Sequence, residues 1–428
     1  MVVFFGGGFI EGGGSLAVPP SAYPILNVSA QNDIVFVYPN YRVNTFGFLP
    51  GKEIAEDEDS DLNPGLLDQK AVLEWVNKYI DQFGGDKDSV GIWGQSAGAG
   101  SVVAQVLSTS EETSPPLFHR ALASSPFWPK TYLYDAPQAQ SIYDTMTDLT
   151  NCTGAINGTL QCLKSLDWEV LAEAALTVAA SHTWNTSSYT WAPVIDGKFL
   201  KRSLSDATVN AKGGNGGRGQ FAILEGWGMY NAHEGNGLQD ATDTGTPPFN
   251  STTASFNAWL AGFLPSFSKS QLDAVRAIYP ASGTAETFLS YNTSYVRAGL
   301  IYRDSVLACP ALWMSKAASG SGWLGQYTIS PARHGSDTIY WNQVNAVQKS
   351  QPLIYQGYAG AFASFMATGN PNEHKIINAT EPGVPELDSG KEFVIESDGF
   401  ENVRINAGEQ SLEARCSFWA SVAGSIPI

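Results

Sequence analysis

The chain has 428 residues, of which 41 are acidic and 24 are basic, so its formal net charge is −17 at pH 7. With no cluster of Lys and Arg, this charge argues against nucleic acids and anionic membrane surfaces as partners. No apolar run is long enough to span a bilayer, so we expect no transmembrane segment. Charged residues make up only 15% of the chain, below the usual quarter, which makes glycans a candidate source of surface solubility.

Sequons and cysteines both favour a secreted protein. Seven Asn-x-Ser/Thr glycosylation sequons occur, at Asn27, Asn151, Asn157, Asn185, Asn250, Asn292 and Asn378. Cys152 and Cys162 lie close enough to close a small loop, which leaves Cys309 and Cys416 to tie the C-terminus back. The alternative is four buried thiols in a cytosolic enzyme. No Cys/His spacing indicates zinc, and we expect no metal.

The N-terminus conflicts with secretion, because Met1-Val-Val-Phe-Phe-Gly has neither a basic n-region nor a cleavage site. We interpret Val2–Phe5 as a core strand. The glycine clusters that follow, at 6–8 and 12–14, can aim backbone N–H groups at an oxyanion, as a glycine-rich loop after a core strand does in esterases. The rival is a dinucleotide fingerprint, but Val18-Pro19-Pro20 cannot open the helix that it requires. We therefore expect no cofactor.

Further along the chain, residues 33–38 form a continuous apolar run that predicts a buried strand. A helix is predicted over 65–83. Its apolar stripe is formed by Val72, Val76, Ile80 and Phe83. A Gly-Gly-Asp turn and a short strand over 90–93 lead into a helix that begins at Ala97. We interpret the bend between them, Gly94-x-Ser96-x-Gly98, as a nucleophile elbow.

Strands alternate with helices over the remainder. Strands are predicted at 121–125, 221–226 and 323–329, and helical patterns at 135–200, 254–264, 269–278 and much of 290–316. There is no internal repeat and no clear domain break. The pattern predicts a single doubly wound α/β domain over 1–428, with helical insertions at about 135–200 and 250–320.

A nucleophilic serine needs a base and an acid, in the chain order Ser, then Asp or Glu, then His. Among five histidines, His334 lies in a loop just beyond a late strand, where an α/β-hydrolase keeps its base. Glu234, after the strand at 221–226, is the best acid; Asp240 and Asp196 are the alternatives.

The sequence resembles a known family, the type-B carboxylesterase/lipase family of cholinesterase-like α/β-hydrolases. It looks most like a fungal extracellular member. The resemblance covers essentially the whole chain. Its early motifs are Phe5-Gly-Gly-Gly-Phe9, Asn40-Tyr-Arg-Val43, Asn63-Pro-Gly-Leu-Leu-Asp-Gln69 and Gly94-Gln-Ser-Ala-Gly98. Its later motifs are Ala192-Pro-Val-Ile-Asp-Gly197, His334-Gly-Ser-Asp337, Thr368-Gly-Asn-Pro-Asn372 and Cys416-Ser-Phe-Trp419.

The resemblance implies an α/β-hydrolase fold and a serine carboxylic-ester hydrolase, with a small-molecule or lipid ester as substrate. Ser96, Glu234 and His334 match the catalytic triad of the family. Its oxyanion hole matches the N–H groups of Gly7, Gly8 and Ala97, and its disulfides match Cys152–Cys162 and Cys309–Cys416.

The sequence departs from the family in three places. Phe5 stands where relatives often have His or Tyr, and Gln95 stands where many have Glu, which weakens the case for a cationic choline substrate. The family also has strands, a disulfide loop and a signal peptide before the segment at Met1, so we expect an N-terminally shortened form of a secreted protein. The alternatives are a catalytically silent, cholinesterase-like adhesion protein and an inactive truncated fragment. Oligomeric state is not readable from the sequence.

Overall fold

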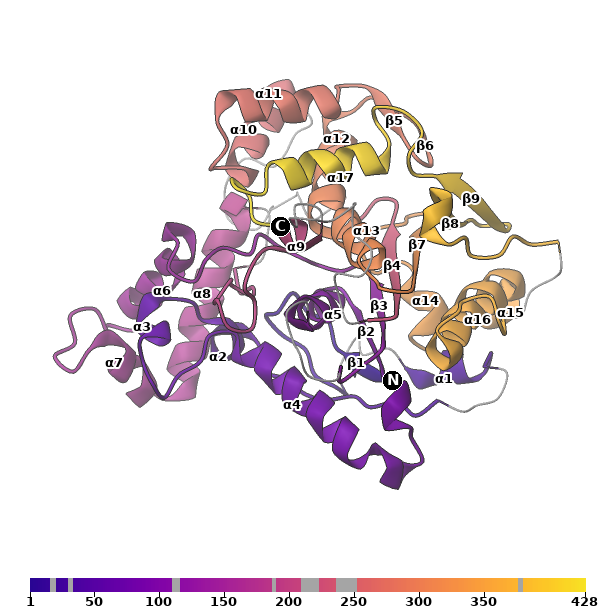
Figure 1. Ribbon diagram of the computed structural model, residues 1–428. Helices are drawn as coiled ribbons and strands as arrows, with labels where there is room; N and C mark the ends of the chain where they lie inside the picture. Colours follow the sequence, from indigo (N-terminus) through magenta and orange to yellow (C-terminus); the bar gives the residue numbers. More distant parts are fainter. Residues whose placement is uncertain are drawn as a thin grey trace.

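The computed structural model has a seven-stranded sheet at its centre, with helices packed on both faces (Figure 1). The structure describes residues 1–15, 21–29, 34–109, 116–186, 190–208, 223–235, 252–375 and 380–428, without the side chains of 181–186 and 288–289. Among the described helices, none is both long and apolar enough to cross a membrane.

The large sheet has the strand order β1-β2-β3-β4-β7-β8-β9, and all its neighbours are parallel except the last pair, β8 and β9. A separate antiparallel hairpin pairs β5 with β6. The strands are β1 (Val2–Phe4), β2 (Gly91–Gln95), β3 (Arg120–Ser124), β4 (Glu225–Asn231), β5 (Gly283–Ala285), β6 (Phe288–Tyr291), β7 (Ser321–Tyr327), β8 (Lys391–Ile395) and β9 (Phe400–Arg404).

Seventeen α-helices lie in the described part of the chain. In the first half they are α1 (Ala22–Leu26), α2 (Asn44–Phe48), α3 (Lys52–Ala55), α4 (Pro64–Tyr79), α5 (Ala97–Ser108), α6 (Pro137–Leu149), α7 (Thr159–Ser165), α8 (Trp168–Thr186) and α9 (Leu204–Thr208). In the second half they are α10 (Thr253–Phe263), α11 (Lys269–Ile278), α12 (Ser294–Arg303), α13 (Cys309–Lys316), α14 (Thr338–Trp341), α15 (Val347–Ser350), α16 (Pro352–Thr368) and α17 (Leu412–Ser421). A π-helical turn, Asp304–Ala308, joins α12 to α13.

Alternating residues of each strand feed two separate cores, because successive side chains point to opposite faces of a sheet. Val2, Phe4 and Ile92 belong to the core that includes α5 and α13. On the other face, Trp93 and Trp227 pack on Phe362 of α16, with ring centroids 5.8 and 5.0 Å apart. Both faces of the sheet are therefore buried, as the continuous apolar strand patterns predict.

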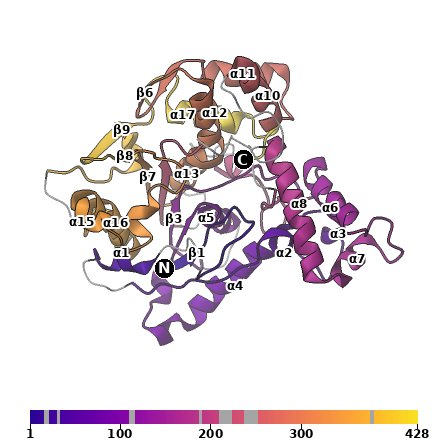
Figure 2. The same ribbon diagram turned by 180° about the vertical axis from the view of Figure 1, so that it is seen from behind.

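The two views of the molecule agree on where the helices lie. In Figure 1, α15, α16 and α1 lie on one side of the sheet, and α3, α6, α7 and α8 form a group on the opposite side of the molecule. Figure 2 shows the same grouping from behind, with α10, α11, α12 and α17 gathered above the sheet. The predicted doubly wound α/β architecture is confirmed.

Four predicted details differ from the structure. Residues 34–38 form only a β-bridge, Val2 with Val37, where a full strand was predicted from residue 33, which lies outside the described residues. β4 begins at Glu225, later than predicted, and residues 221–222 are not described. Phe83, predicted on the buried stripe, is 62% exposed, because α4 gives way to a 3-10 turn at Ile80–Phe83. β8, β9 and the two strands of the β5–β6 hairpin were not predicted at all.

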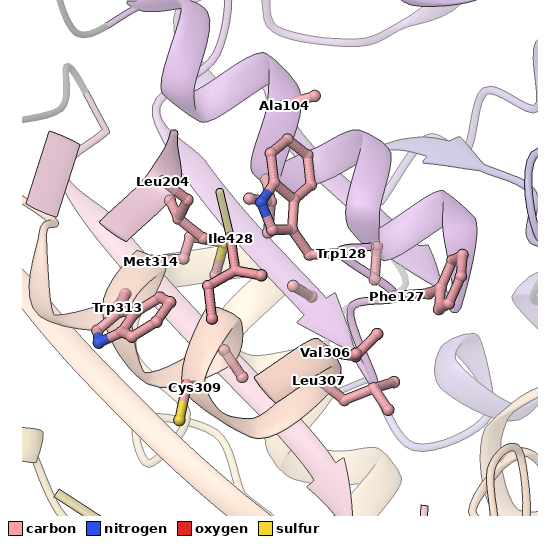
Figure 3. Close-up of a cluster of buried hydrophobic side chains, with 14 of the residues drawn as sticks. Ala104, Phe127, Trp128, Leu204, Val306, Leu307, Cys309, Trp313, Met314 and Ile428 are labelled. Atoms are coloured by element: carbon pink, nitrogen blue, oxygen red, sulfur yellow. The ribbon is translucent and has the colours of Figure 1, made fainter. Parts of the chain in front are cut away.

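The C-terminal part of the chain is tied into the core. Cys309 and Cys416 form a disulfide across 107 residues, and Cys152 and Cys162 form another across 10, so both expected pairings are present. Figure 3 shows Trp128 beside the helix that carries Ala104, with Ile428 next to Met314 in the same apolar cluster. Trp128 and Trp191 are both fully buried and belong to this core.

Candidate active site

Ser96 occupies a sharp turn between β2 and α5. Its backbone has φ +58° and ψ −126°, in a region that non-glycine residues rarely adopt and that costs about 1–3 kcal/mol. The turn is held by the surrounding backbone, because Ser96 N–H donates to Ser124 O at 3.1 Å and Ser96 O accepts from Phe127 and Gly100. Strand, turn and helix together have the geometry that the elbow pattern predicts.

Close packing of α5 on the sheet makes this turn possible. A Cβ at Gly94 would lie 2.2 Å from the backbone carbon of Gly98, and a Cβ at Gly98 would lie 2.1 Å from the carbonyl oxygen of Phe4. Neither distance is compatible with a side chain. The two glycines of the pattern are therefore required by the contact of helix with strand.

Three parallel strands bring the serine, the histidine and the acid to one edge of the sheet. Ser96 follows β2, Glu234 follows β4 and His334 follows β7, and the carboxyl ends of parallel strands share one edge. His334 Nε2 lies 2.8 Å from Ser96 Oγ, and His334 Nδ1 lies 2.5 Å from Glu234 Oε2. Glu234 lies 138 positions after Ser96, and His334 lies 100 positions after Glu234. The three side chains nevertheless form a continuous series of hydrogen bonds from hydroxyl to carboxylate.

The burial and charges around His334 are those of a base that works in a shielded site. The Glu234 side chain is fully buried, whereas that of His334 is 21% exposed. Burial disfavours the imidazolium, but the charge of Glu234, its hydrogen bond and the charge of Asp337 outweigh burial and raise the pKa of His334 above its ordinary value. Protonation of His334 when it accepts a proton from Ser96 is therefore favoured by two acidic side chains.

A second set of polar residues connects the acid to the base. Asn231, at the end of β4, donates its backbone N–H to Glu234 Oε1 at 2.7 Å. Its side-chain amide donates to Arg333 O at 2.8 Å and to Asp337 Oδ1 at 3.1 Å. Sequence analysis assigned no role to Asn231 or Asp337. Asn231 lies three residues before Glu234, and Asp337 lies three residues after His334. This spacing is the sequence signal that could have found them.

The glycine loop after β1 runs past the serine. A Cβ at Gly6 would lie 3.2 Å from Ser96 Cβ, and Gly7 and Gly8 have φ of +125° and +64°. Within the described residues, no hydrogen bond engages the backbone N–H groups of Gly7, Gly8 and Ala97. These three amides are therefore available to a negatively charged oxygen bound beside Ser96.

Of the two alternative acids, Asp196 and Asp240, the structure describes only Asp196. Asp196 is committed to its own loop, where Oδ1 accepts from the N–H groups of Lys198, Phe199 and Leu200 and Oδ2 accepts from Asn63. Asp240 lies outside the described residues. In the described part of the chain, no group of three or more His, Cys, Asp or Glu side chains could hold a metal ion.

A family model described as "Carboxylesterase family" matches residues 1–419. The chain belongs to the carboxylesterase family. This esterase is 28% identical to Carboxylesterase patB of Aspergillus clavatus over 419 residues, which are 97% of this chain and 69% of the relative. It is 39% identical over 202 residues to the Secreted triacylglycerol lipase LIP1 of Gibberella zeae, covering 46% of this chain and 34% of that one.

The fold of the esterase is also that of a solved structure. The crystal structure of Aspergillus niger EstA matches it with a TM-score of 0.77 and 24% identity, covering 100% of this chain and 81% of that one. The predicted α/β-hydrolase fold and the predicted family are both confirmed, and the chain is a carboxylic-ester hydrolase.

Proposed function

We propose that Ser96, His334 and Glu234 are the catalytic triad of this esterase and that it works through an acyl-enzyme on Ser96. The observation that carries the proposal is the pair of contacts at His334, 2.8 Å to the serine hydroxyl and 2.5 Å to the carboxylate. This arrangement has the nucleophile, the base and the orienting acid of a serine hydrolase in sequence.

The reaction follows from the positions of these groups. Ser96 Oγ attacks the ester carbonyl carbon while His334 Nε2 takes its proton, and Glu234 stabilises the imidazolium. The carbonyl oxygen becomes an alkoxide that the N–H groups of Gly7, Gly8 and Ala97 bind. Removal of one such donor typically raises the barrier by about 3–4 kcal/mol. His334 then protonates the departing alcohol, and a water activated by the same imidazole releases the acid.

Uncharged esters are the proposed substrates. Gln95, the residue before the nucleophile, is neutral and buried, so it offers no charge to a cationic alcohol. The net charge of −17 disfavours the approach of anionic esters. One relative is named a carboxylesterase and another a secreted triacylglycerol lipase. Assays with p-nitrophenyl esters of graded chain length will measure the acyl length that this esterase prefers.

The test of the triad is the turnover of a short p-nitrophenyl ester by the wild type and by Ser96→Ala. We expect kcat/KM to fall by at least about 10⁴-fold, because no other group replaces the nucleophile. Ser108→Ala, at the far end of the same helix, serves as the control and should keep wild-type turnover. Equal activity of Ser96→Ala and wild type would refute the assignment, and an inactive wild type would favour a silent binding protein or an inactive fragment.

We further propose that this esterase acts outside the cell as a glycoprotein. Several relatives are named secreted lipases, and two disulfides are typical of an oxidising compartment. The sequons at Asn27, Asn151, Asn157 and Asn292 are exposed, while Asn250, Asn378 and the side chain of Asn185 are not described. Expression through a eukaryotic secretory pathway should give a product that loses mass on treatment with an N-glycosidase. An unchanged mass would contradict the proposal.

A further inference from the structure

Asn231 is hydrogen-bonded to both the loop that carries Glu234 and the loop that carries His334. It is the last residue of β4 and is 1% exposed. Its backbone N–H holds one oxygen of Glu234, at 2.7 Å, which leaves the other oxygen to face His334. Its side-chain amide reaches across to Arg333 O at 2.8 Å, one residue before the imidazole.

Asp337 fixes the orientation of this amide. Asp337 Oδ1 accepts the second N–H of Asn231, and Oδ2 accepts from Trp341 Nε1 and Tyr358 OH, both at 3.0 Å. The carboxylate is 1% exposed and anchored from α14 and α16. Because Arg333 O and Asp337 Oδ1 are both acceptors, only the NH₂ end of the amide can face them.

Asn231 therefore links the loop of the acid to the loop of the base through Glu234 and Arg333, and not through the imidazole itself. The loops are also joined by a backbone bond from His233 N–H to Ala332 O at 2.8 Å. Loss of the Asn231 amide should therefore loosen the two loops without separating them. A shift of about 1 Å in a catalytic group can reduce turnover by about 100-fold.

We propose that Asn231 is a positioning residue that, held by Asp337, sets the Glu234–His334 geometry for turnover. The inference rests on the proposed function of the triad. A residue of this kind acts on kcat and leaves ester binding unchanged. A purely structural asparagine at a strand end would instead change the free energy of unfolding and leave turnover per active site alone.

The test is the Asn231→Ala variant, assayed with a short p-nitrophenyl ester. Active sites are counted by stoichiometric reaction with an organophosphonate, so that kcat refers to folded enzyme only. We expect kcat to fall about 10- to 100-fold, with KM within about threefold of the wild-type value. If Asn231→Ala folds poorly, Asn231→Ser, which keeps a short polar side chain but cannot make both bonds, gives the same comparison.

Asn77→Ala is the matched control. Asn77 Nδ2 also bridges two backbone carbonyls, Leu73 O at 3.1 Å and Leu117 O at 2.7 Å, but it does so on α4. This variant should keep the wild-type kcat whatever its thermal stability. A wild-type kcat per active site in Asn231→Ala would overturn the inference. A similar fall in kcat in the Asn77→Ala control would show a general effect on folding and would overturn the inference too.

A double-mutant cycle with Asp337→Asn tests whether the two residues act as one unit. If they do, the combined variant loses less kcat than the product of the two single losses. Strictly multiplicative losses would contradict a shared action. The outcome is separate from the triad assignment, because that assignment fails only if wild-type esterase is inactive or if Ser96→Ala retains activity.

Discussion

At the residue scale, two acidic side chains control the protonation of the His334 imidazole. Glu234 and Asp337 both act on His334, and their charges raise its pKa against the opposing effect of burial. Tyr358 from α16 and Tyr327 from β7 face Asp337 in turn, and their own pKa values are raised by burial and by its charge. A base with a raised pKa is protonated, and therefore inactive, up to a higher pH than an ordinary histidine.

Replacement of Asp337 by Asn should lower the pKa of His334. The substitution removes one of the negative charges that stabilise the imidazolium, so the base becomes neutral at a lower pH. The acid limb of the profile of kcat/KM against pH should move to lower pH, whatever happens to the plateau. The profile of the wild type is the reference. A limb that stays in place or moves to higher pH would show that the charge of Asp337 does not reach the imidazole.

The residues of the triad could be predicted from sequence, but the residues that support them could not. Gly94-x-Ser96-x-Gly98 and a histidine after a late strand are local patterns, and each has a chemical reason. Asn231 and Asp337 lie three residues from Glu234 and His334, but that spacing alone assigns them no role, because their roles depend on two loops meeting in space. The distance between those loops is set by the pairing of β4 with β7, which no short segment encodes.

At the scale of elements, the position of the nucleophile depends on how closely α5 approaches β1. Gly98 lies where a Cβ would be 2.1 Å from Phe4 O and 2.8 Å from the backbone carbon of Phe5. β1 leads directly into the glycine loop, so any displacement of the helix from the strand also displaces the N–H groups that face Ser96. Nucleophile and oxyanion donors are therefore positioned by the same contact.

The Gly98→Ala variant should be destabilised by about 3 kcal/mol or more, because backbone atoms must move to admit the methyl group. Urea denaturation followed by circular dichroism measures the change in the free energy of unfolding. Gly424→Ala is the control, since nothing lies within 4 Å of a Cβ at that position. Similar stability of the two variants would contradict the packing described for the elbow.

Elements with strong periodicity were predicted well, and those defined by long-range pairing were not. The helix after Ser96 and the helix at 64–79 have clear apolar faces, and both are present. Residues 34–38 are as apolar as a buried strand, yet only Val37 pairs with β1. Lys391–Ile395 and Phe400–Arg404 mix charged with apolar residues, and pairing with β7 and with each other makes them strands.

At the scale of the whole molecule, the two disulfides constrain very different lengths of chain. Cys309–Cys416 closes 107 residues and ties α13 to α17, whereas Cys152–Cys162 closes 10 residues within a peripheral helical region. In the chain-entropy model the first bond contributes about 5 kcal/mol and the second about 3 kcal/mol. Of these two helices, α13 packs against β4 and β7, the strands that lead to Glu234 and His334.

Replacement of both cysteines of each pair by serine tests this difference. We expect the Cys309→Ser/Cys416→Ser variant to lose about 2 kcal/mol more unfolding free energy than the Cys152→Ser/Cys162→Ser variant. Both variants should keep the wild-type kcat at a temperature where they are folded, since neither disulfide belongs to the site. Equal losses, or a larger loss from the short loop, would contradict the entropic account.

The most direct measurement of the central claim is covalent labelling by an organophosphonate, followed by mass spectrometry of the peptides. The reagent reacts with a serine only where a base and oxyanion donors activate it. We predict one phosphonate per chain, attached to Ser96, and no label on the Ser96→Ala or His334→Ala variants. A label on another residue, or equal labelling of the His334→Ala variant, would show that the site described here is not the catalytic centre.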